Sequence, residues 1–465
     1  MIFLDRTTAF FNAFAELMWS TPMVMLLVGG GLLLTLYSRL HPFRHFGHAI
    51  GLLRGRYDSP DDPGHVPHAQ ALSTALSGTL GLGNIAGVAI AISVGGPGAV
   101  FWMWITALVG ITTKFFTATL AVMYRGRDST GALHGGPMYV IREGLGRRWY
   151  PLAVLFAIAG MFGTLPVFQA NQMVALLRHA LAEPVGLASA NNHLGFDFIA
   201  SSLLAALVLM VVAGRIQRIG KVTISLVPAM VLLYLGMTAV VLFQHAGEIP
   251  SMLTLIITDA FSGQAAAGGT IGTVIMVGVS RGAFSNEAGI GTESLAHGAA
   301  RTREPVREGL VAMTGPVIDT LIVCTCTALI ILLTGAWQDN SGIEGVTLTA
   351  SAIATVFPRS GIFLLLLMVA LLSFSTIVTF WFYGAKCFGF LFGAQRQHFY
   401  TPIYIILIVA GALASLDMVN AVVVGLYGVM AIPTMVSTFL LAPRVNAAAK
   451  RYFQELRREN FPQVR

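Results

Sequence analysis

The sequence predicts an all-α integral membrane protein. Hydrophobic residues make up 55% of the 465 residues, charged residues only 11%, and the mean hydropathy is +0.76. So little polar surface cannot cover a globule of this size in water. Apolar segments of about 20 residues recur along the chain, and this is the length that a helix needs to cross a hydrocarbon core of about 30 Å. Composition and segment length together therefore define the fold class.

We predict eleven membrane spans, of which the tenth is the shortest. They are Met18–Ser38, Ala69–Val94, Gly98–Tyr124, Tyr150–Leu181, Phe196–Ala213, Val222–Phe243, Gly268–His297, Val311–Leu333, Gly361–Phe392, Ile403–Ala414 and Val419–Leu441. An amphipathic segment between the eighth and ninth spans, Val346 to Phe357, is predicted to be either an external lid or an interfacial helix.

The placement of positive charge predicts the orientation of the chain. If the loop from Arg39 to Arg56 lies in the cytoplasm, alternation of the spans puts most of the 28 lysine and arginine residues on that side. The positive-inside rule then predicts an external N-terminus and a cytoplasmic C-terminus. The net charge of +7 is explained by topology, because the charges are spread over many short loops and form no nucleic-acid-binding stripe. The basic tail after Pro443 is predicted to lie against anionic lipid.

Little in the sequence favours an enzyme. The three cysteines, Cys324, Cys326 and Cys387, lie within apolar segments and not in exposed loops, so a disulfide framework is not expected. The polar residues show no metal-ligand spacing and no nucleophile motif. The histidines His41, His45 and His48 belong to a basic loop, where a solvated surface is the ordinary interpretation.

Two spans are interrupted by glycine and polar residues. GTLGLGN runs from Gly78 to Asn84, and RGAFSNEAGIGTES runs from Arg281 to Ser294. A bilayer core supplies no water to loose backbone groups, so such breaks survive only where protein or a hydrated cavity surrounds them. Broken helices in corresponding halves of a membrane chain point to a transporter binding site near the bilayer midplane.

The breaks predict a chemistry as well as a place. A helix that stops inside the membrane leaves free N–H groups at the start of its second half and free carbonyls at the end of its first half. The N–H groups suit a carboxylate, and the carbonyls suit Na⁺ or an ammonium group. Polar side chains accompany the glycines at this depth, namely Thr79, Asn84, Ser285, Asn286 and Glu287.

Several polar residues within the spans have two interpretations. Arg281 and Glu287 either pair as a gate or scaffold, or act separately. Lys114 has no acidic neighbour in its own span, and Asp319 is a candidate partner. One further set either binds substrate and cation or serves helix packing through hydrogen bonds to neighbouring helices or to its own helix carbonyls. This set comprises Gln169, Asn171, Gln172, Ser373, Ser375 and Thr376.

The chain closely resembles the alanine/glycine:cation symporter family, the sodium:alanine symporters of the amino acid-polyamine-organocation superfamily. The resemblance is carried by GTLGLGNIAGVA, GGPGAVFWMWITALVGITTKF, GGPMY, QAN, RGAFSNEAGIGTESLAHGAA and FSTI, which extend over essentially the whole chain. It implies the leucine-transporter fold, with five helices followed by five inverted helices and one extra helix in front. The expected units are an N-terminal helix and loop (1–68), two repeats (69–244 and 245–442) and a basic tail (443–465).

The resemblance also implies site residues. A sodium site would use the main-chain carbonyls of Ser77, Leu80 and Leu372 and the hydroxyls of Ser375 and Thr376. The substrate would lie beside it. Its expected contacts are Thr79, Gly81, Gln169, Gly282, Asn286 and Thr376.

Two departures from the family pattern concern this site. An acidic residue usually follows the lysine of TKF, and Thr117 stands there in this chain. The aromatic residue after FSTI is usually read as tryptophan, and here Phe380 precedes Trp381. The first departure leaves the compensation of Lys114 open, and the second leaves the wall of the substrate pocket open.

The resemblance implies sodium-coupled import of small neutral amino acids, alanine or glycine, in a bacterial inner membrane. Na⁺ would be the coupling ion, and no other cofactor and no nucleic acid is expected. One alternative is a proton-coupled or exchange-type carrier on the same fold, for which Glu287 is the strongest titratable candidate. A second alternative is a membrane amino-acid sensor that does not transport.

Overall fold

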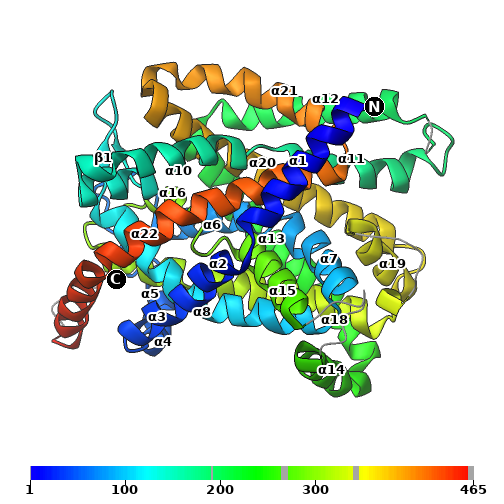
Figure 1. The fold of residues 1–465 in the computed structure, drawn as a ribbon, viewed down its shortest axis with the longest axis horizontal. Coiled ribbons are helices and arrows are strands. Elements are labelled where there is room, and N and C mark those ends of the chain that lie inside the picture. Colours follow the sequence, from blue (N-terminus) through cyan, green and yellow to red (C-terminus); the bar gives the residue numbers. More distant parts are fainter. Residues whose placement is uncertain (1, 190–191, 263–270, 339–344, 459–465) are drawn as a thin grey trace.

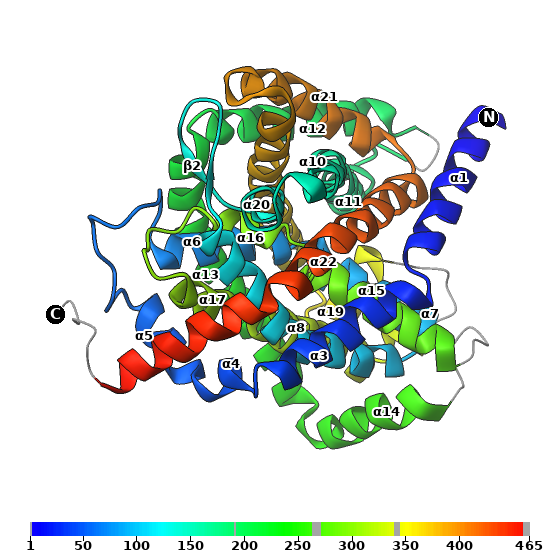
Figure 2. The same ribbon diagram turned by 60° about the vertical axis from the view of Figure 1, so that its left-hand side comes forward.

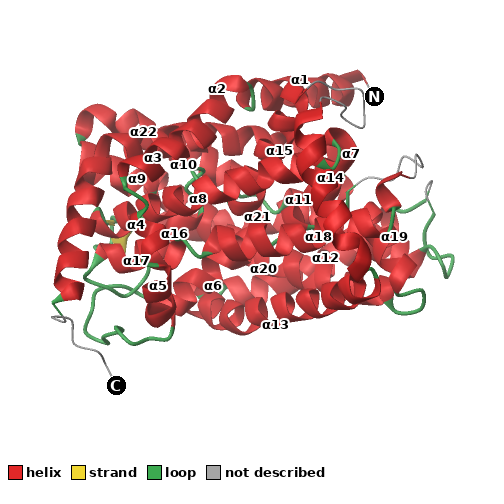
Figure 3. Cartoon of the chain, turned by 90° about the horizontal axis from the view of Figure 1, so that it is seen from below, coloured by secondary structure: helices red, strands yellow, loops and turns green. Residues whose placement is uncertain are grey.

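The computed structural model describes residues 2–189, 192–262, 271–338 and 345–458 and is helical throughout most of that length (Figure 3). Its strands form one short antiparallel hairpin, β1 (Gly126–Arg127) and β2 (Leu133–His134), in which Gly126 lies opposite His134. The predicted all-α class is therefore confirmed.

The helices up to residue 244 are these: α1 (Ile2–Met18), α2 (Thr21–Val24), η1 (Met25–Gly29), α3 (Gly30–Tyr37), α4 (His41–Arg44), α5 (Phe46–Leu53), α6 (His68–Thr79), η2 (Leu82–Asn84), α7 (Ala86–Gly95), α8 (Gly98–Met123), α9 (Pro137–Tyr139), η3 (Val140–Leu145), η4 (Arg147–Trp149), α10 (Tyr150–Gly163), α11 (Val167–Leu177), η5 (Arg178–Ala182), α12 (Leu194–Val212) and α13 (Arg215–Gln244).

The remaining helices are η6 (Ala246–Glu248), α14 (Ile249–Ser262), α15 (Ile271–Asn286), α16 (Glu293–His297), α17 (Pro305–Ala312), η7 (Val317–Cys324), α18 (Thr325–Leu333), η8 (Ala336–Gln338), α19 (Val346–Val356), α20 (Gly361–Phe392), η9 (Ala394–Phe399), α21 (Tyr400–Leu413) and α22 (Leu416–Arg457). The label η marks 3₁₀ turns, except in η1, η3, η5 and η7, which are π-helical.

The predicted number of eleven spans is not established by helix length alone. Within the described residues, seven helices are long and apolar enough to cross a membrane, and two bent pairs raise this number to nine. Of the other predicted spans, α21 has only 14 residues and α15 has 16 before its break. Eleven spans therefore remains a prediction, whereas a multi-pass membrane protein is the plain result.

The first span begins earlier than predicted. The prediction placed its start at Met18, but α1 already begins at Ile2 and continues into α2 and α3 with a bend of 46°. Figure 1 shows α1 lying along α22. Gly425 and Gly428 on α22 make this approach possible, since a Cβ on either would lie within 3 Å of side-chain atoms of Phe14 or Met18. The early polar residues of α1 hid this helix from a search for apolar runs.

Other boundaries also differ from the prediction. The fourth span is divided at Thr164–Pro166 into α10 and α11. The eleventh span and most of the basic tail form one helix, α22, which passes through Pro433 and Pro443. The predicted amphipathic helix is present as α19, while α14, at the edge of the molecule in Figures 1 and 2, was not predicted. The predicted residue Gly268 lies outside the described residues.

Helix α8 is the most buried of the single long apolar helices among the described residues and packs against α15, α17, α3 and α22. Its contact with α15 is very close at Gly278, where a Cβ would lie 2.4 Å from the carbonyl oxygen of Ala99. Small residues allow membrane helices to approach in this way, since packing rather than water drives their association. This contact positions the second broken helix.

One end of the bundle gathers arginines and is named the basic end below. It consists of residues 54–66, 125–134 and 298–307. Arg125 ties these segments together, because its guanidinium donates to the carbonyl oxygens of Pro63, Gly298 and Thr302 at 2.8–3.1 Å and also to that of Ala300.

We predict that Gly278→Ala destabilises the protein by about 1–3 kcal/mol, because the new methyl group would force α15 away from α8. Gly236→Ala is the matched control. Gly236 also lies inside a helix, but nothing lies within 4 Å of a Cβ there. The control variant should be as stable as the wild type or up to about 1 kcal/mol more stable. Thermal unfolding of the purified protein in detergent measures both, and equal melting of the two variants would contradict the close-packing account.

Candidate functional site

The first predicted break is present. Helix α6 ends at Thr79, Leu80 has ψ 84°, Gly81 is extended, and the chain turns through η2 into α7 with a bend of 57° between the two halves. The amide N–H of Gly81 donates to the side-chain oxygen of Asn84 at 2.9 Å. A side chain of the break therefore satisfies a backbone group that no water could reach.

The second break is shorter than predicted. Residues 281–286, which the prediction included in the break, are still helical and end α15. The backbone leaves the helix at Glu287, with φ 55°, and Gly289 and Gly291 follow with φ 85° and 95°. The side-chain oxygen of Asn286 accepts from the N–H of Ala288 at 2.9 Å and forms an Asx turn directly after the helix end. Left-handed backbone favours glycine, so the two glycines explain how the chain reverses here.

The two breaks are in direct contact. The side-chain amide of Asn84 donates to the hydroxyl of Ser285 at 3.0 Å. A Cβ on Gly83 would lie 3.2 Å from the ring of Phe284, so the backbone of the first break rests on the last turn of α15. The two interrupted segments therefore lie against each other, whereas their joint role in one binding site stays a prediction.

Asp319 lies between the two breaks, and sequence reasoning did not place it in the site. Its carboxylate accepts from the side chains of Asn84 at 2.8 Å, Ser285 at 2.8 Å and Thr320 at 2.7 Å, and the residue is fully buried. The surrounding segment, η7, is π-helical, an irregularity that is frequent at functional sites. The signal in the sequence is a charged residue inside an apolar span, which predicts a buried polar partner but does not indicate which one.

Buried charges flank the site. The ammonium group of Lys114 attracts the carboxylates of both Glu287 and Asp319 electrostatically. Glu287 accepts from the hydroxyl of Tyr427 at 2.9 Å and from that of Thr292 on the far side of the break.

The expected pair of Arg281 and Glu287 is not formed between these two described residues. Arg281 instead donates to the side chain of Asn420 at 3.3 Å, and Glu287 has the two hydroxyl donors named above. The reason is that α15 is still helical at Arg281, which directs this residue toward α22. Glu287 therefore holds the break in shape without an arginine.

Glu293 supplies the acidic group that is missing at position 117. It is fully buried at the start of α16, and its carboxylate accepts from the hydroxyl of Thr117 at 3.0 Å. Its second oxygen has no hydrogen-bond partner among the described residues. The departure at Thr117 is thus matched by a carboxylate from the other broken helix, 176 residues away in sequence.

The residues expected to bind sodium come together where α6 meets α20. The hydroxyl of Thr376 donates to the carbonyl of Ser77 at 3.0 Å, and the hydroxyl of Ser77 donates to the carbonyl of Ser375 at 2.8 Å. The hydroxyl of Ser375 donates to the carbonyl of Leu372 within its own helix at 3.0 Å. Leu80 directly precedes Gly81, whose Cβ position would lie 2.8 Å from the Thr376 hydroxyl. The result is a buried cluster of carbonyl and hydroxyl oxygens.

The residues expected to bind substrate fall into two groups. Thr79, Gly81 and Thr376 lie together beside this oxygen cluster, and Thr79 is buried. Gly282 instead lies in the helical part of α15 against α8, where a Cβ would lie 3.1 Å from Met103 and Thr106. Asn286 donates to the hydroxyl of Thr320 at 3.2 Å and forms the Asx turn described above.

The polar residues of α11 have separate surroundings. Gln169 is buried, and its side-chain oxygen has no partner among the described residues. Its neighbour Phe168 meets Phe284 edge to face at 5.8 Å between ring centroids, which brings this part of α11 close to the breaks. Asn171 donates to the carbonyls of Gly411 and Ala414 and so links α11 to α21.

A cavity of about 490 Å³ lies at the basic end and is lined by His65, Ala299, Trp381, Phe382 and Lys386, among others. Trp381 therefore faces this cavity, whereas Phe380 is buried one turn beyond Thr376. A second cavity of about 300 Å³ lies at the opposite end and is lined by Asn171, Gln172 and the loop before α22. The candidate site thus lies between two cavities.

A pair of broken helices that meet inside a bundle of apolar helices, with a buried cluster of carbonyl and hydroxyl oxygens beside them, is typical of a membrane transporter. Comparison with known proteins agrees with this class. The model of the sodium:alanine symporter family matches residues 4–465, and the chain belongs to that family.

The sodium/alanine symporter AgcS of Methanococcus maripaludis is 36% identical, over 96% of this chain and 97% of that protein. The probable sodium/glutamine symporter GlnT of Bacillus subtilis is 33% identical, over 95% of this chain and 89% of that protein. The structure of MhsT in complex with L-phenylalanine matches 85% of this chain and 98% of that chain with a TM-score of 0.57 at 13% identity. The expected leucine-transporter fold is therefore confirmed.

We predict that Thr117→Val costs about 1–3 kcal/mol of stability, because it removes a hydroxyl that the buried carboxylate of Glu293 accepts from. Thr113→Val on the same helix is the matched control, since its buried hydroxyl donates only to the carbonyl of Val109 in its own helix at 3.1 Å. The control should change stability by less than about 0.5 kcal/mol. Thermal unfolding in detergent measures the difference, and two equal shifts would remove the special role of Thr117.

Proposed function

We propose that this protein imports a small neutral amino acid, alanine or glycine, together with Na⁺ by alternating access, with its basic end in the cytoplasm. The observation that carries the proposal is the junction of α6 and α20, where carbonyls of a broken helix and hydroxyls of an intact one meet. Membership of the sodium:alanine symporter family supports the same conclusion.

The oxygen cluster suits a hard monovalent cation. Ser77, Leu80 and Leu372 would offer main-chain carbonyls, and Ser375 and Thr376 would offer hydroxyls. In the structure, the hydroxyl of Ser77 bonds to the carbonyl of Ser375, and the hydroxyl of Thr376 bonds to the carbonyl of Ser77, across α6 and α20. A cation that replaces these bonds would hold the two helices together, which couples its binding to the position of α6.

Close packing at the first break supports a small substrate. Thr376 and Phe284 lie within about 3 Å of where side chains at Gly81 and Gly83 would begin. Alanine has only a methyl side chain and glycine has none, so these zwitterions would displace the fewest atoms of the first break. The substrate ammonium group would meet the carbonyls at the end of α6, and Gln169 would supply its unpartnered oxygen. The name of GlnT indicates a larger substrate, so the pocket wall is the feature to compare.

The driving force is sufficient for accumulation. A membrane potential of about 100 mV contributes roughly 2.3 kcal/mol for each imported charge. This corresponds to about a fiftyfold concentration gradient before any sodium gradient is added. One bundle of helices would rock against the other around the site, in an inner membrane of a bacterium. Ion and substrate must then stabilise each other to the same extent.

Buried carboxylates favour one alternative, a proton-coupled carrier. Glu287, Glu293 and Asp319 are all buried, and among the described residues the ammonium group of Lys114 interacts with two of them, Glu287 and Asp319. Burying ionised carboxylates without matching cations is costly, so a proton would be a natural co-substrate. The two functions differ in which ion gradient drives uptake.

Uptake by the purified protein in sealed vesicles tests the proposal. Radiolabelled alanine, glycine, serine, leucine and glutamine are each supplied with a gradient of Na⁺, Li⁺, K⁺ or pH. We expect alanine and glycine to accumulate in the presence of a Na⁺ gradient and glutamine to enter much more slowly. Uptake that ignores Na⁺ and follows the pH gradient would establish the proton-coupled alternative, and absence of uptake in every condition would favour a sensor.

The double variant Ser375→Ala/Thr376→Ala should weaken sodium dependence and alanine affinity together, each by roughly tenfold, because the two bindings are coupled. Equilibrium binding of alanine at several Na⁺ concentrations measures both effects. Thr238→Val is the control, because it removes a buried hydroxyl that donates to its own helix at Tyr234. Unchanged alanine binding at low Na⁺ in the double variant would exclude the α6–α20 junction as the sodium site.

A further inference from the structure

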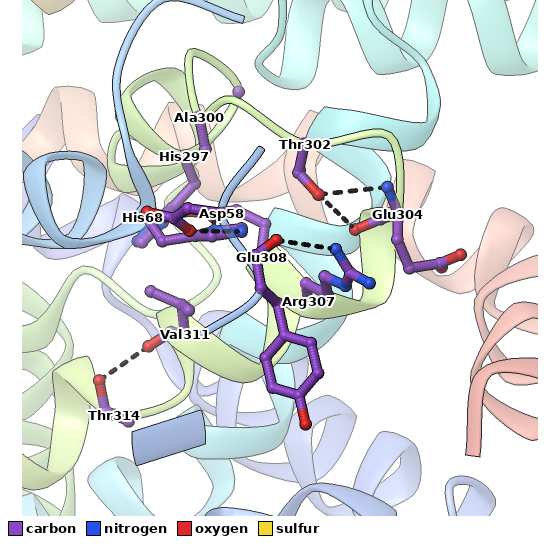
Figure 4. A network of polar contacts seen from close by, with 12 residues as sticks. Asp58, His68, His297, Ala300, Thr302, Glu304, Arg307, Glu308, Val311 and Thr314 are labelled. Atoms are coloured by element: carbon purple, nitrogen blue, oxygen red, sulfur yellow. Dashed lines mark hydrogen bonds and ion pairs between the residues drawn. The ribbon is translucent and has the colours of Figure 1, made fainter. Parts of the chain in front are cut away.

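A chain of acidic and histidine side chains joins both broken helices at the basic end. Figure 4 shows Asp58, His68, His297 and Glu308 gathered there. The carboxylate of Glu308 accepts from the ring of His297 at 2.6 Å through one oxygen and from the ring of His68 through the other. His68 begins α6 and His297 ends α16, so one carboxylate on α17 holds the outer ends of both broken helices.

Backbone hydrogen bonds reinforce this junction. The segment before α6 and the segment after α16 run side by side in a parallel bridge between Val66 and Ala300. The N–H groups of His65 and Val66 donate to the carbonyl of Ala299 at 2.8 and 3.2 Å, and the N–H of Arg301 donates to Val66 at 2.7 Å. We name this junction, residues 58–66 and 297–304 with His68 and Glu308, the latch. While it is formed, the end of α6 cannot move away from the end of α16.

Two atoms of the latch lack the partners that burial requires. The Nε2 atom of His68 and the Oδ1 atom of Asp58 are both buried, and neither has a hydrogen-bond partner among the described residues. They lie 3.9 Å apart and face each other. A neutral His68 donates one N–H to Glu308 and leaves Nε2 without a proton. A doubly protonated ring would donate to Glu308 and present its second N–H to Asp58.

The charges around His68 favour a proton on it. His68 is 1% exposed and Glu308 0%, so water screens their interaction little. Asp58 lies in the loop outside the spans, where burial raises the pKa of its carboxyl and the neighbouring His68 ring opposes that rise.

Other charged groups also face the latch. The positive charge of Arg307, on α17, attracts the carboxylate of Asp58 and repels a positive charge on His68. Arg301 also attracts the carboxylate of Asp58. Arg125, from the loop after α8, interacts with Glu308. From α5, His48 faces Arg307, and burial lowers the pKa of this histidine to about 4. The arginines keep their charge at neutral pH, which leaves the two histidines bonded to Glu308, His68 and His297. Of these, His68 also faces a second carboxylate, that of Asp58, and is therefore the group placed to share a proton between two carboxylates.

We propose that the latch is a regulatory proton site, in which a proton shared by His68 between Glu308 and Asp58 holds the basic end shut. The inference uses the proposed function in one respect, namely that the ends of α6 and α16 form the inner gate. The bound ligand is a proton from the cytoplasm, and the groups that bind it lie outside the predicted sodium and substrate residues.

The sign of the effect follows from linkage. The latched state binds the proton more tightly than the open state, because only the latched state places both carboxylates around His68. Lowering the pH therefore shifts the equilibrium toward the latched state, and raising it loosens the latch. One linked proton changes the ratio of latched to open protein by at most about tenfold for each pH unit. A cytoplasm that turns acidic would thus slow opening of the inner gate.

Hydrogen exchange of the full-length protein in lipid nanodiscs tests the proposal without substrate or Na⁺. Protection of peptides covering 58–66 and 297–304 is measured between about pH 6 and about pH 8, after correction for the chemical exchange rate. We expect protection in the wild type to fall as the pH rises, by several-fold over this range. His68→Asn keeps a donor for Glu308 but cannot become a cation, so its protection should not vary with pH.

Two further variants keep the test decisive. Asp58→Asn alters a loop residue whose side chain is 33% exposed, and it is the variant least expected to disturb folding; its pH dependence should be reduced. His134→Gln is the control, since His134 is also paired with an aspartate at 3.0 Å at the basic end. Burial lowers the pKa of His134 to about 4, so it does not titrate in the measured range, and its variant should follow the wild type.

Three results would overturn the proposal. They are pH-independent protection of the latch in the wild type, a wild-type pH profile in His68→Asn, and, if that variant does not fold, a wild-type profile in Asp58→Asn. Because this measurement reports on the latch alone, its failure is distinct from a failure of sodium-coupled uptake in vesicles.

Discussion

The hydrogen bonds of Asn84 are the interaction on which the site depends. Its side-chain oxygen accepts from the N–H of Gly81 in its own break, and its amide donates to Ser285 beside the other break and to Asp319. No bilayer water is available for these groups, so each break must be completed by protein. In the first break, the side chain of Asn84 satisfies the N–H of Gly81, and its amide is in turn satisfied by Ser285 of the second broken helix. Each interruption is therefore tolerable only because the other lies against it.

Buried charge is the second constraint on this bundle. Glu287 supports the second break through Thr292 and Tyr427, Glu293 reaches Thr117 on α8, and Asp319 joins both breaks. These carboxylates are surrounded mainly by hydroxyl and amide donors, with the single ammonium group of Lys114 acting on two of them. Excess negative charge at membrane depth favours the entry of cations. The same feature explains both why the proposed coupling ion is a cation and why a proton remains its rival.

The site and the basic end are connected through short, rigid elements. Helix α6 runs from His68 in the latch to Thr79 at the break, and α16 runs from Glu293 beside Thr117 to His297 in the latch. Ligand binding at one end of α6 and proton binding at the other therefore act on the same rigid body. The proposed sodium ion between α6 and α20 and the proposed proton between α6 and α17 would both restrain the movement of α6, so the two proposals concern one moving element.

Local composition determined a large part of this protein. The membrane class, both interruptions and the amphipathic helix α19 follow from apolar length, glycine position and polarity, which are properties of neighbouring residues. Family resemblance identified the residues of the α6–α20 junction. Only the tertiary structure decided that Arg281 still belongs to a helix, that Asp319 lies between the breaks and that Glu293 completes Thr117. Asn84 and Asp319 are 235 residues apart in sequence, and Thr117 and Glu293 are 176 residues apart. Bonds over such separations depend on helix packing that no local pattern encodes.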